Sequence, residues 1–500
     1  MTLRNGRSRG ILATLLVAAC AALAVPAVSP AAKIKPSPLP PQPAAGTFKH
    51  IIVIVQENRT PDNLFQGLCV PPFGTAGRCS VTPGFAQYDI QTSAWIDKKG
   101  TVQPQTVPLA NTYDLNHSHN GWLAQCDMAT GTSQCRMDGS AGVSCRAAPG
   151  KTCPPMPQFR YVDNATGTVS PYLELATQYG WANRMFQTNQ GPSYPAHQFL
   201  FGGTSAPSDS DDAAGTFVTE NLVGTGAVGG FKKKAGCASP ADTKVEVDGP
   251  SGKSFIYPCF EHKTMPDLFP ATVSWQYYAP SPGTIWTAPN SIKHICQSTG
   301  PGGKCAGPMW TKHLQFHPPN VVNDIAACKL RSVSWVIPAG PYSDHAGPSS
   351  GAGGPAWVAS IVNAIGKSTS CDGGNGYWND TAIFVTWDDW GGWYDHVAPP
   401  ILAPPQGAYQ YGFRVPLLVV SAHTPKNYIN NVDHDFGSIL RFVQHNFGIP
   451  EGALTFADRR SKSDLRAFFD FTVPARALTT IPAPSPMPAH VRDHTAPDNG

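Results

Sequence analysis

The sequence predicts an α/β fold with a mostly parallel central sheet, helices on both faces and many long loops. Four mostly apolar runs of strand length occur at 51–55, 333–337, 382–386 and 415–420. Such runs are typical of strands that are buried on both faces, as in parallel sheets. Apolar residues at helical spacing occur in 357–365 and 436–443, and strands combined with helices in this way favour a parallel sheet. The 48 Gly and 50 Pro among 500 residues indicate long ordered connections.

The chain starts with the features of an export signal. Three arginines in the first nine residues precede an uncharged apolar run over 11–25, and small residues follow. Because this run of 15 residues is short for a membrane span, we expect a cleaved signal over residues 1–32 and a secreted or periplasmic protein. The run Val17-Ala18-Ala19-Cys20 leaves a second interpretation open, namely a lipoprotein anchored to the cell envelope through Cys20.

Composition divides the rest of the chain into three parts. Residues 33–46 are rich in Pro and predict a linker, and residues 473–500 predict a Pro-rich tail. Between them, residues 47–472 carry the strand and helix patterns and predict one main domain. Within this domain, residues of about 202–265 lack such patterns and are rich in Gly, Asp, Ser and Lys, which predicts an insertion.

The charge and the hydrophobic content exclude some classes of protein. Lys+Arg number 36 and Asp+Glu 33, a net charge of +3, so no strongly basic field predicts nucleic-acid binding. A hydrophobic share of 41% can fill a large core, which excludes disorder of the whole chain.

The cysteines agree with export. Of the 13 Cys, removal of the signal takes away Cys20 and leaves an even number, as expected in an oxidising compartment. No paired CxxC occurs, so a zinc site built on cysteines is disfavoured. Sequence does not determine connectivity, but our hypothesis is sequential pairing: Cys69/Cys79, Cys126/Cys135, Cys145/Cys153, Cys237/Cys259, Cys296/Cys305 and the remaining Cys328 and Cys371.

Two predicted strands end in acidic and amide residues. Glu57 and Asn58 follow the run 51–55, and Asp388 and Asp389 follow the run 382–386. In open parallel sheets, ligands bind at the carboxyl ends of the strands. An oxygen-rich set of ligands suits a hard divalent cation, so calcium, magnesium or manganese is favoured over zinc.

A hydroxyl nucleophile is offered by Ser193. It follows Gly191-Pro192, which is turn chemistry, and an apolar run comes next, so Ser193 is predicted near the start of a helix. Backbone N–H groups at a helix N-terminus bind phosphate well. The alternative is that Ser193 only caps the helix, and the spacing by itself favours capping.

Several blocks of this chain resemble the bacterial phosphoesterase family, which holds secreted phospholipases C and an acid phosphatase. The resemblance extends from about Lys49 to Phe471. The chain departs from many relatives at Ala196-His197 and at Ala346-Gly347, on the substrate side, so the resemblance indicates the reaction better than the substrate. The blocks are Glu57-Asn58-Arg59, Asp114-Leu115-Asn116-His117, Gly191-Pro192-Ser193, Asp344-His345, Phe413-Arg414-Val415-Pro416 and, most specific, WDDWGGWYDHVAPP at 387–400.

The resemblance implies an alkaline-phosphatase-like fold and a phosphoric ester hydrolase. Phospholipase C activity on a phospholipid at a membrane surface is the first expectation. The alternatives are an acid phosphomonoesterase and a non-catalytic surface-binding protein on the same scaffold. The resemblance also implies that Ser193 is the nucleophile and forms a phosphoserine intermediate. One divalent metal ion is implied, held by Glu57, Asn58, Asp388 and Asp389.

Histidines complete the predicted site. The resemblance assigns His117, His345 and, through a shorter motif, His294 to phosphate binding or to protonation of the leaving group. We expect Asp344 to hold the imidazolium of His345, and His396 to orient Asp389 rather than bind metal. The remaining histidines that we expect to be structural are His119, His197, His313, His317 and His434.

Overall fold

The computed structural model describes residue 2 and residues 43–223, 234–316, 320–347, 351–403 and 409–483. The elements described here all belong to one unit, residues 34–500. Cys20, the predicted site of lipid attachment, lies outside the described residues. So does His317, which was expected to be a structural histidine. So do the predicted signal apart from residue 2, most of the predicted linker, and the predicted tail from 484 onward.

An eight-stranded sheet forms the centre of the described chain. All four predicted strands belong to it, and each is buried along its whole length. Its order is β14 (Leu314–Gln315), β13 (Trp275–Tyr278), β15 (Val333–Val336), β1 (His50–Gln56), β16 (Thr381–Trp387), β17 (Leu417–Val420), β8 (Gly180–Ala182) and β18 (Tyr428–Asn430).

The strand directions confirm a mostly parallel sheet with one exception. β17 runs antiparallel to both of its neighbours, β16 and β8, and the other pairings in the sheet are parallel. The predicted mostly parallel sheet is therefore confirmed, and β17 is the strand that departs from the parallel direction. A strand buried on both faces has the same continuous apolar pattern in either direction, so its sequence does not report its direction.

The register of the three central strands brings their carboxyl ends to one level. Gln56 at the end of β1 pairs with Trp387 at the end of β16. On the other side, Ile54 of β1 pairs with Val336, the last residue of β15. The residues that follow these three strands therefore leave the sheet at the same edge, where ligands of such sheets bind.

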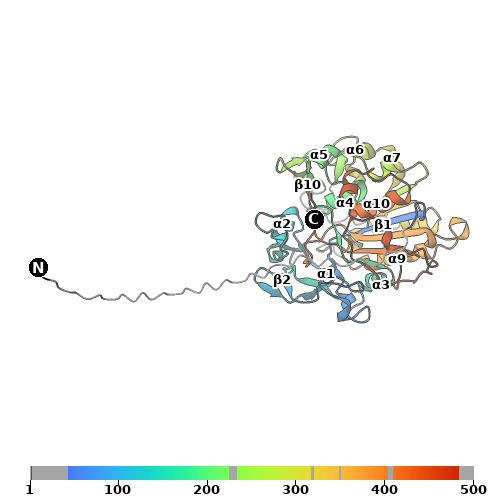
Figure 1. The fold of residues 1–500 in the computed structure, drawn as a ribbon. Helices are drawn as coiled ribbons and strands as arrows, with labels where there is room; N and C mark the ends of the chain where they lie inside the picture. Colours follow the sequence, from blue (N-terminus) through green and yellow to red (C-terminus); the bar gives the residue numbers. More distant parts are fainter. Residues whose placement is uncertain are drawn as a thin grey trace. The chain divides into compact units, whose positions relative to one another are not determined.

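Helices lie on both faces of the sheet, as predicted. In Figure 1, α4 (Ser193–Gly202) and α10 (Phe436–Asn446) lie above β1, and α3 (Ser170–Gln178) and α9 (Gly354–Gly366) lie below it. The members of each pair also pack against each other. Trp335 of β15 donates its indole N–H to the Leu200 carbonyl of α4 at 3.0 Å, which ties this helix to the sheet.

The predicted insertion forms a small sheet of its own. After α5 (Asp209–Ala214), the strands β10 (Phe217–Val223), β11 (Lys244–Asp248) and β12 (Ser254–Ile256) pair antiparallel. β10 packs against α4. Between its paired residues Val218 and Leu222, three residues of β10 face a single residue of β11, so β10 contains a bulge.

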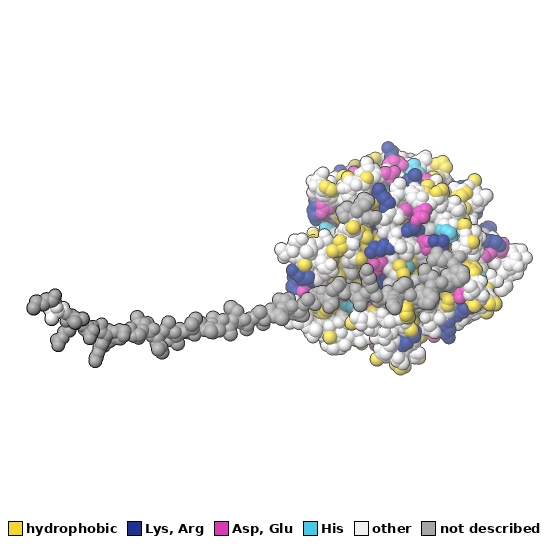
Figure 2. All heavy atoms as spheres, viewed as in Figure 1, with side chains coloured by type: hydrophobic (Ala, Val, Ile, Leu, Met, Phe, Trp, Pro, Cys, Tyr) yellow, Lys and Arg dark blue, Asp and Glu magenta, His cyan; other side chains and the backbone are white. Residues whose placement is uncertain are grey.

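The remaining described elements are short. Among the described helices, none has the length and apolarity needed to cross a bilayer. On the face drawn in Figure 2, Lys and Arg side chains are interspersed with Asp and Glu side chains. The other helices are α1 (Pro61–Leu64), α2 (His119–Cys126), α6 (Lys293–Cys296), α7 (Pro308–His313), α8 (Asn320–Ala326) and α11 (Phe456–Arg460). The other strands are β2 (Trp95–Asp97), β3 (Gly100–Val102), β4 (Gln105–Val107), β5 (Tyr113–Leu115), β6 (Cys145–Ala147), β7 (Arg160–Val162), β9 (Met185–Phe186) and β19 (His434–Asp435).

Disulfides connect all twelve described cysteines, and the sequential hypothesis is confirmed. Five bonds join neighbours 8 to 22 residues apart in the chain. The sixth joins Cys328 to Cys371 across 43 residues, and so links the chain before β15 to the chain after α9. Each bond limits the unfolded ensemble, which typically stabilises a fold by about 2–4 kcal/mol.

Candidate active site

Three carboxylates and one amide meet at the carboxyl ends of β1 and β16. Glu57, Asn58, Asp388 and Asp389 are all 0% exposed. Asn58 has a left-handed backbone with φ of +63°, and its N–H donates to Asp388 Oδ1 at 3.0 Å. The chain after β16 turns at Gly391, where φ is +64° and a Cβ would lie 2.3 Å from the Asn58 carbonyl oxygen. Only glycine fits this close approach of two strand ends.

Ser193 lies at the centre of this group. It is the first residue of α4, and Pro192 occupies the cap position without a side-chain hydrogen bond. The Ser193 hydroxyl is placed to donate to Glu57 Oε2 at 3.2 Å and to Asp389 Oδ2 at 3.1 Å. The alternative that Ser193 serves as a helix cap is therefore wrong, and its hydroxyl faces the predicted metal ligands.

His197 also belongs to the group, which differs from our expectation of a structural role. It is 1% exposed, its Nε2 lies 2.8 Å from Glu57 Oε1, and the same nitrogen lies 3.8 Å from Asp388 Oδ2. Residues four apart lie on the same face of a helix, so His197 is on the side of α4 that carries Ser193. The spacing of four residues from Ser193 was the sequence signal that could have indicated a place for His197 in this group.

The electrostatics of this group call for a cation. Burial and the charge of Asp388 raise the pKa of Glu57 and of Asp389 well above the usual range. Burial lowers the pKa of His197 to about 4, so its imidazole is neutral. Among the described ion pairs, no Lys or Arg reaches these carboxylates. Asp388 Oδ2 and Asn58 Oδ1 are buried without a hydrogen-bond partner. Unpaired oxygen donors converging in a buried, negative site fit a hard divalent cation.

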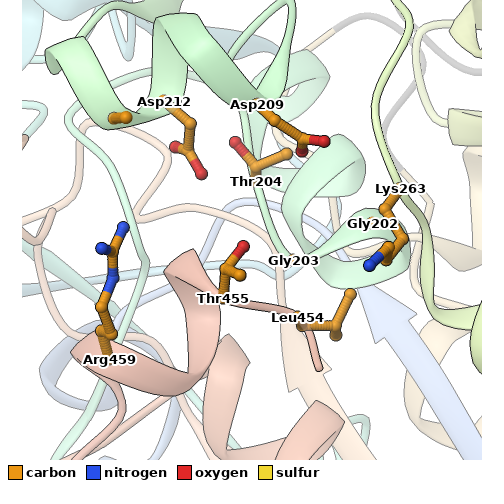
Figure 3. A pocket seen from close by; sticks show the side chains of 10 residues that line it. Gly202, Gly203, Thr204, Asp209, Asp212, Lys263, Leu454, Thr455 and Arg459 are labelled. Carbon is orange, nitrogen blue, oxygen red and sulfur yellow. The ribbon is translucent and has the colours of Figure 1, made fainter. Parts of the chain in front are cut away.

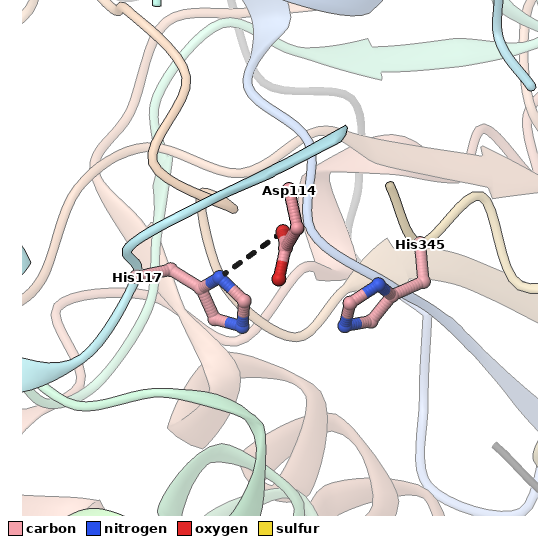
Figure 4. Close-up of side chains that lie close together, drawn as sticks. All are labelled: Asp114, His117 and His345. Carbon is pink, nitrogen blue, oxygen red and sulfur yellow. Dashed lines mark ion pairs between the residues drawn. The ribbon is translucent and has the colours of Figure 1, made fainter. Parts of the chain in front are cut away.

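A second cluster adjoins the first and contains Asp114, His117 and His345 (Figure 4). All three are buried, and the centres of the two imidazole rings are 5.6 Å apart. His117 Nδ1 lies 3.7 Å from Asp114 Oδ1 and 2.7 Å from the Leu115 carbonyl oxygen. The structure therefore brings two of the three predicted histidines together beside the carboxylates.

His117 connects the two clusters through Asn58. Because His117 Nδ1–H donates to a carbonyl, its Nε2 is the acceptor of the ring, and the Asn58 amide lies 3.0 Å from it. This hydrogen bond assigns the amide nitrogen of Asn58 to His117 and leaves the amide oxygen free. His117 thus orients Asn58 so that it presents an oxygen, as a metal ligand must.

His345 has one nitrogen free. Its Nδ1 lies 2.6 Å from the Ala346 carbonyl oxygen, and its buried Nε2 has no hydrogen-bond partner among the described residues. The expectation that Asp344 holds His345 was wrong. Asp344 instead accepts hydrogen bonds from the Tyr172 hydroxyl at 2.7 Å and from the Trp387 indole at 3.1 Å. Burial raises the pKa of this carboxyl to about 7.

The structure does not place His294 with the other predicted residues. Its Nδ1 lies 2.6 Å from Glu261 Oε1 and its Nε2 3.2 Å from Asp267 Oδ1. The hydrogen bond that His294 donates to Asp267 outweighs burial and raises the pKa of His294 to about 9. Because carboxylates occupy both ring nitrogens, His294 has no free donor for a phosphate, and we leave it out of the proposed mechanism.

The expectation that His396 orients Asp389 was wrong, since the His396 ring contacts other carboxylates. Its Nδ1 lies 2.7 Å from Asp62 Oδ2 and its Nε2 3.0 Å from Asp89 Oδ1. Arg414 donates two hydrogen bonds of 3.0 Å to Asp395, next to His396 in the chain. The ring and the guanidinium pair with the three carboxylates of this cluster, so these residues form a salt-bridge network rather than a set of free metal ligands.

The bulge of β10 contacts the first turns of two helices. Asn221 Oδ1 accepts a hydrogen bond of 3.0 Å from the N–H of Tyr194, the second residue of α4. Glu220 Oε1 accepts a hydrogen bond of 3.0 Å from the N–H of His119, the first residue of α2. α4 begins with Ser193 and α2 begins two residues after His117. The insertion therefore connects the segments that carry Ser193 and His117, a role that its composition did not indicate.

A separate cavity of about 310 Å³ lies at the other end of α4 (Figure 3). Gly202, Asp212, Lys263 and Arg459 contribute to its lining. Asp212 is buried, which raises the pKa of its carboxyl to about 8. Ser193 and Gly202 are the first and last residues of α4, nine steps of about 1.5 Å apart, so the cavity is distinct from the carboxylate site.

Comparisons with known proteins identify the family that the chain resembles. Residues 48–450 match the model of the Phosphoesterase family. The non-hemolytic phospholipase C of Pseudomonas aeruginosa is 28% identical over 179 residues, which are 30% of this chain and 25% of that protein. Phospholipase C B of Mycobacterium tuberculosis is 28% identical over 178 residues, 32% of this chain and 33% of that protein. The chain thus spans a quarter to a third of the length of these curated relatives.

Among solved structures, a protein of the alkaline phosphatase superfamily from Vibrio parahaemolyticus aligns with 61% of this chain and 64% of its own. The TM-score is 0.30 at 12% sequence identity. At this score, the description of the fold relies on the sheet topology of the chain itself.

Proposed function

The chain belongs to the phosphoesterase family, and on this basis we propose that it is a metal-assisted phosphoric ester hydrolase. We propose further that it is a phospholipase C-like phosphodiesterase, because the curated proteins that it resembles include phospholipases C. Its substrate would then be a phospholipid at a membrane surface. An acid phosphomonoesterase uses the same phosphoryl chemistry, but its substrate lacks the second ester group that a diester keeps on phosphorus.

One observation carries the proposal: the Ser193 hydroxyl faces two buried carboxylates from two different strand ends. It lies 3.2 Å from Glu57 Oε2 and 3.1 Å from Asp389 Oδ2, at the N-terminus of a ten-residue helix. The N-terminal backbone N–H groups favour a phosphate there. A non-catalytic scaffold would have no need to keep a hydroxyl among unpaired buried charges, which cost stability.

In the proposed reaction, Ser193 is the nucleophile. Its Oγ forms a bond to phosphorus while the bond to the leaving oxygen breaks, and its proton passes to a facing carboxylate such as Asp389. Glu57, Asn58, Asp388 and Asp389 would hold one divalent cation, which supplies charge stabilisation for the serine oxygen and the phosphate oxygens. Water then attacks the phosphoserine on the opposite side and gives a proton to His345, which has lost its own to the leaving group. The bond between Ser193 Oγ and phosphorus breaks, and the proton held by the carboxylate returns to Oγ as the phosphorylated product leaves.

His345 is the proposed proton donor to the leaving oxygen. Its Nδ1–H is held by the Ala346 carbonyl, so its Nε2, which has no partner among the described residues, is the atom that can carry the second proton. His117 lies beside it but uses its Nε2 for Asn58. We therefore propose that His117 orients a metal ligand and that His345 faces the substrate.

We propose that the mature protein is exported. Six disulfides in the described chain are typical of an oxidising compartment. The mass of the N-terminal peptide of the mature protein would distinguish cleavage near residue 32 from lipid attachment at Cys20.

The test of the function compares two substrates with the same chromophore. The wild-type protein should hydrolyse p-nitrophenylphosphorylcholine faster than p-nitrophenyl phosphate, and a chelator should abolish both activities. The reverse preference would indicate the phosphomonoesterase, and no hydrolysis of either would indicate the inert scaffold.

Ser193→Ala should lower kcat at least about a thousandfold, roughly 4 kcal/mol of barrier, while Ser193→Thr keeps a hydroxyl and part of the activity. Turnover of Ser193→Ala within about tenfold of wild type would exclude Ser193 as the nucleophile.

A further inference from the structure

The proposed mechanism gives His197 no task, although this side chain is buried among the proposed metal ligands. It is 1% exposed, and its Nε2 lies 2.8 Å from Glu57 Oε1 and 3.8 Å from Asp388 Oδ2. Its position on α4, four residues after Ser193, directs it to the same site. Two roles are open to an imidazole there: a nitrogen ligand of the metal, or a hydrogen-bond donor to Glu57.

The other ring nitrogen distinguishes these roles. His197 Nδ1 is buried and has no hydrogen-bond partner among the described residues. If Nε2 bound a metal, the ring proton would sit on Nδ1 as a buried donor without an acceptor. Metal-bound histidines almost always donate that second N–H to an acceptor, and buried N–H groups without partners are rare. If the proton sits on Nε2 instead, it meets Glu57 Oε1, and Nδ1 is only an unused acceptor.

We propose that His197 is a positioning residue that donates its Nε2–H to Glu57 Oε1, an inference that rests on the proposed metal-assisted function. This hydrogen bond occupies one oxygen of Glu57 and turns the other, Oε2, toward Ser193 Oγ at 3.2 Å. His197 thereby sets which Glu57 oxygen meets the metal and the nucleophile. A neutral donor suits this task, because a Lys or Arg in its place would compete with the metal for the carboxylate charge.

An indole ring holds the imidazole in this orientation. The ring of Trp286 stacks on His197 with centres 6.3 Å apart and an angle of 17° between the planes. The same indole stacks on His345 with centres 6.1 Å apart and an angle of 30°. Trp286 is 0% exposed and contacts both His197, on the metal side, and His345, on the proposed substrate side. The rotation of His197 about its side-chain bonds is therefore restricted by packing.

The experiment measures metal binding rather than turnover. Metal-depleted wild type, His197→Leu and His197→Gln are titrated with Mn²⁺ and, separately, with Zn²⁺ in a calorimeter. His197→Leu fills the same space without a donor and should weaken Mn²⁺ binding about 10–100-fold, as the loss of such an outer partner typically does. His197→Gln keeps an N–H of similar reach and should bind Mn²⁺ close to wild type.

The two ions separate a positioning residue from a ligand. Loss of a positioning residue should weaken Mn²⁺ and Zn²⁺ by similar factors. Loss of a nitrogen ligand should weaken Zn²⁺ much more, because imidazole suits zinc better than manganese. Unequal losses of this kind, or unchanged Mn²⁺ affinity in His197→Leu, would overturn the proposal.

Two controls keep the result interpretable. In a Glu57→Gln background, His197→Leu should change Mn²⁺ affinity far less than in wild type, because the hydrogen bond joins these two residues. If His197→Leu fails to fold, the comparison of wild type with His197→Gln for both ions remains, and a selective loss of Zn²⁺ there would again overturn the proposal. A wild-type protein that binds Mn²⁺ but hydrolyses neither phosphate ester would refute the proposed function and leave the role of His197 standing.

Discussion

The salt-bridge network around His396 gives a pH test of the fold. Both ring nitrogens face carboxylates, Nδ1 at 2.7 Å from Asp62 and Nε2 at 3.0 Å from Asp89, so both carry hydrogens and the ring is a cation. Arg414 binds Asp395 at 3.0 Å and lies 3.4 Å from Asp89. Two buried cations therefore pair with three buried carboxylates. Removal of the charge on His396 leaves Arg414 to compensate all three carboxylates in this network.

The expected size of the effect follows from the pKa of His396. Burial lowers it, but the charge and hydrogen bonds of Asp62 and Asp89 outweigh burial and raise the pKa to about 10. A cation with a higher pKa in the folded than in the unfolded state stabilises the fold fully below its unfolded pKa, 6.5. That contribution is lost as the pH rises toward about 10. At about 1.36 kcal/mol per pH unit, it amounts to roughly 4–5 kcal/mol at pH 6 and roughly 1–2 kcal/mol at pH 9.

The perturbation is His396→Gln, which removes the charge and keeps a polar side chain. Equilibrium urea unfolding of wild type and variant between pH 6 and pH 9 gives the difference in the free energy of unfolding. This difference should be largest at pH 6 and should fall by about 3 kcal/mol by pH 9. His423→Gln is the control with the opposite sign. Burial lowers the pKa of His423, and its Nε2 lies 3.1 Å from the Asn379 carbonyl oxygen, so the difference for this variant should be smallest at pH 6 and should rise rather than fall toward pH 9. A constant difference for His396→Gln would show a neutral ring and refute the reasoning.

Three further predictions concern the site. Asp388→Asn and Asp389→Asn should each lower the bound metal and the activity together, and full metal content in both purified variants would place the ligands elsewhere. His345→Ala should lower kcat strongly for alkyl phosphate esters and less for p-nitrophenyl esters, whose leaving group needs little protonation, whereas equal losses would indicate phosphate binding instead. Asn221→Ala removes the acceptor for the Tyr194 N–H and should lower kcat more than it raises KM, while Asn221→Asp, which keeps an oxygen acceptor, should recover most of the activity.

The parts of the fold that could be predicted are those whose signal is local. The runs that became β1, β15 and β16 are strands because only both-face burial accounts for continuous apolar residues, and their burial confirms it. The direction of β17 could not be predicted, because it depends on the route of the chain between Asp389 and Leu417 and not on the strand itself. The bulge of β10 could not be predicted either, because a bulge is defined by how one strand pairs with its neighbour, here β11.

The candidate site divides in the same way. Glu57, Asn58, Asp388 and Asp389 could be found because each follows a buried strand directly, and the register of β1 with β16 brings them level. The roles of the histidines could not be predicted from the sequence, because each role depends on which side chains the imidazole ring contacts in the folded chain. His197 has the helical spacing from Ser193 that the other site residues lack, yet a histidine on a buried helix face is more often part of the core, and only its contact with Glu57 decides between the two.

The loop after β16 shows why acidic motifs alone do not identify a metal site. It carries Asp388 and Asp389 and, a few residues later, Asp395, all 0% exposed and all with the same local surroundings of Trp and Gly. Asp395 receives both ends of the Arg414 guanidinium, supplied from 19 residues further along the chain. No Lys or Arg in the described ion pairs reaches Asp388 or Asp389, and Asp388 keeps an oxygen without a partner. Since buried carboxylates require compensation, the pair without a protein cation is the one that fits a bound ion, and that difference exists only in the folded chain.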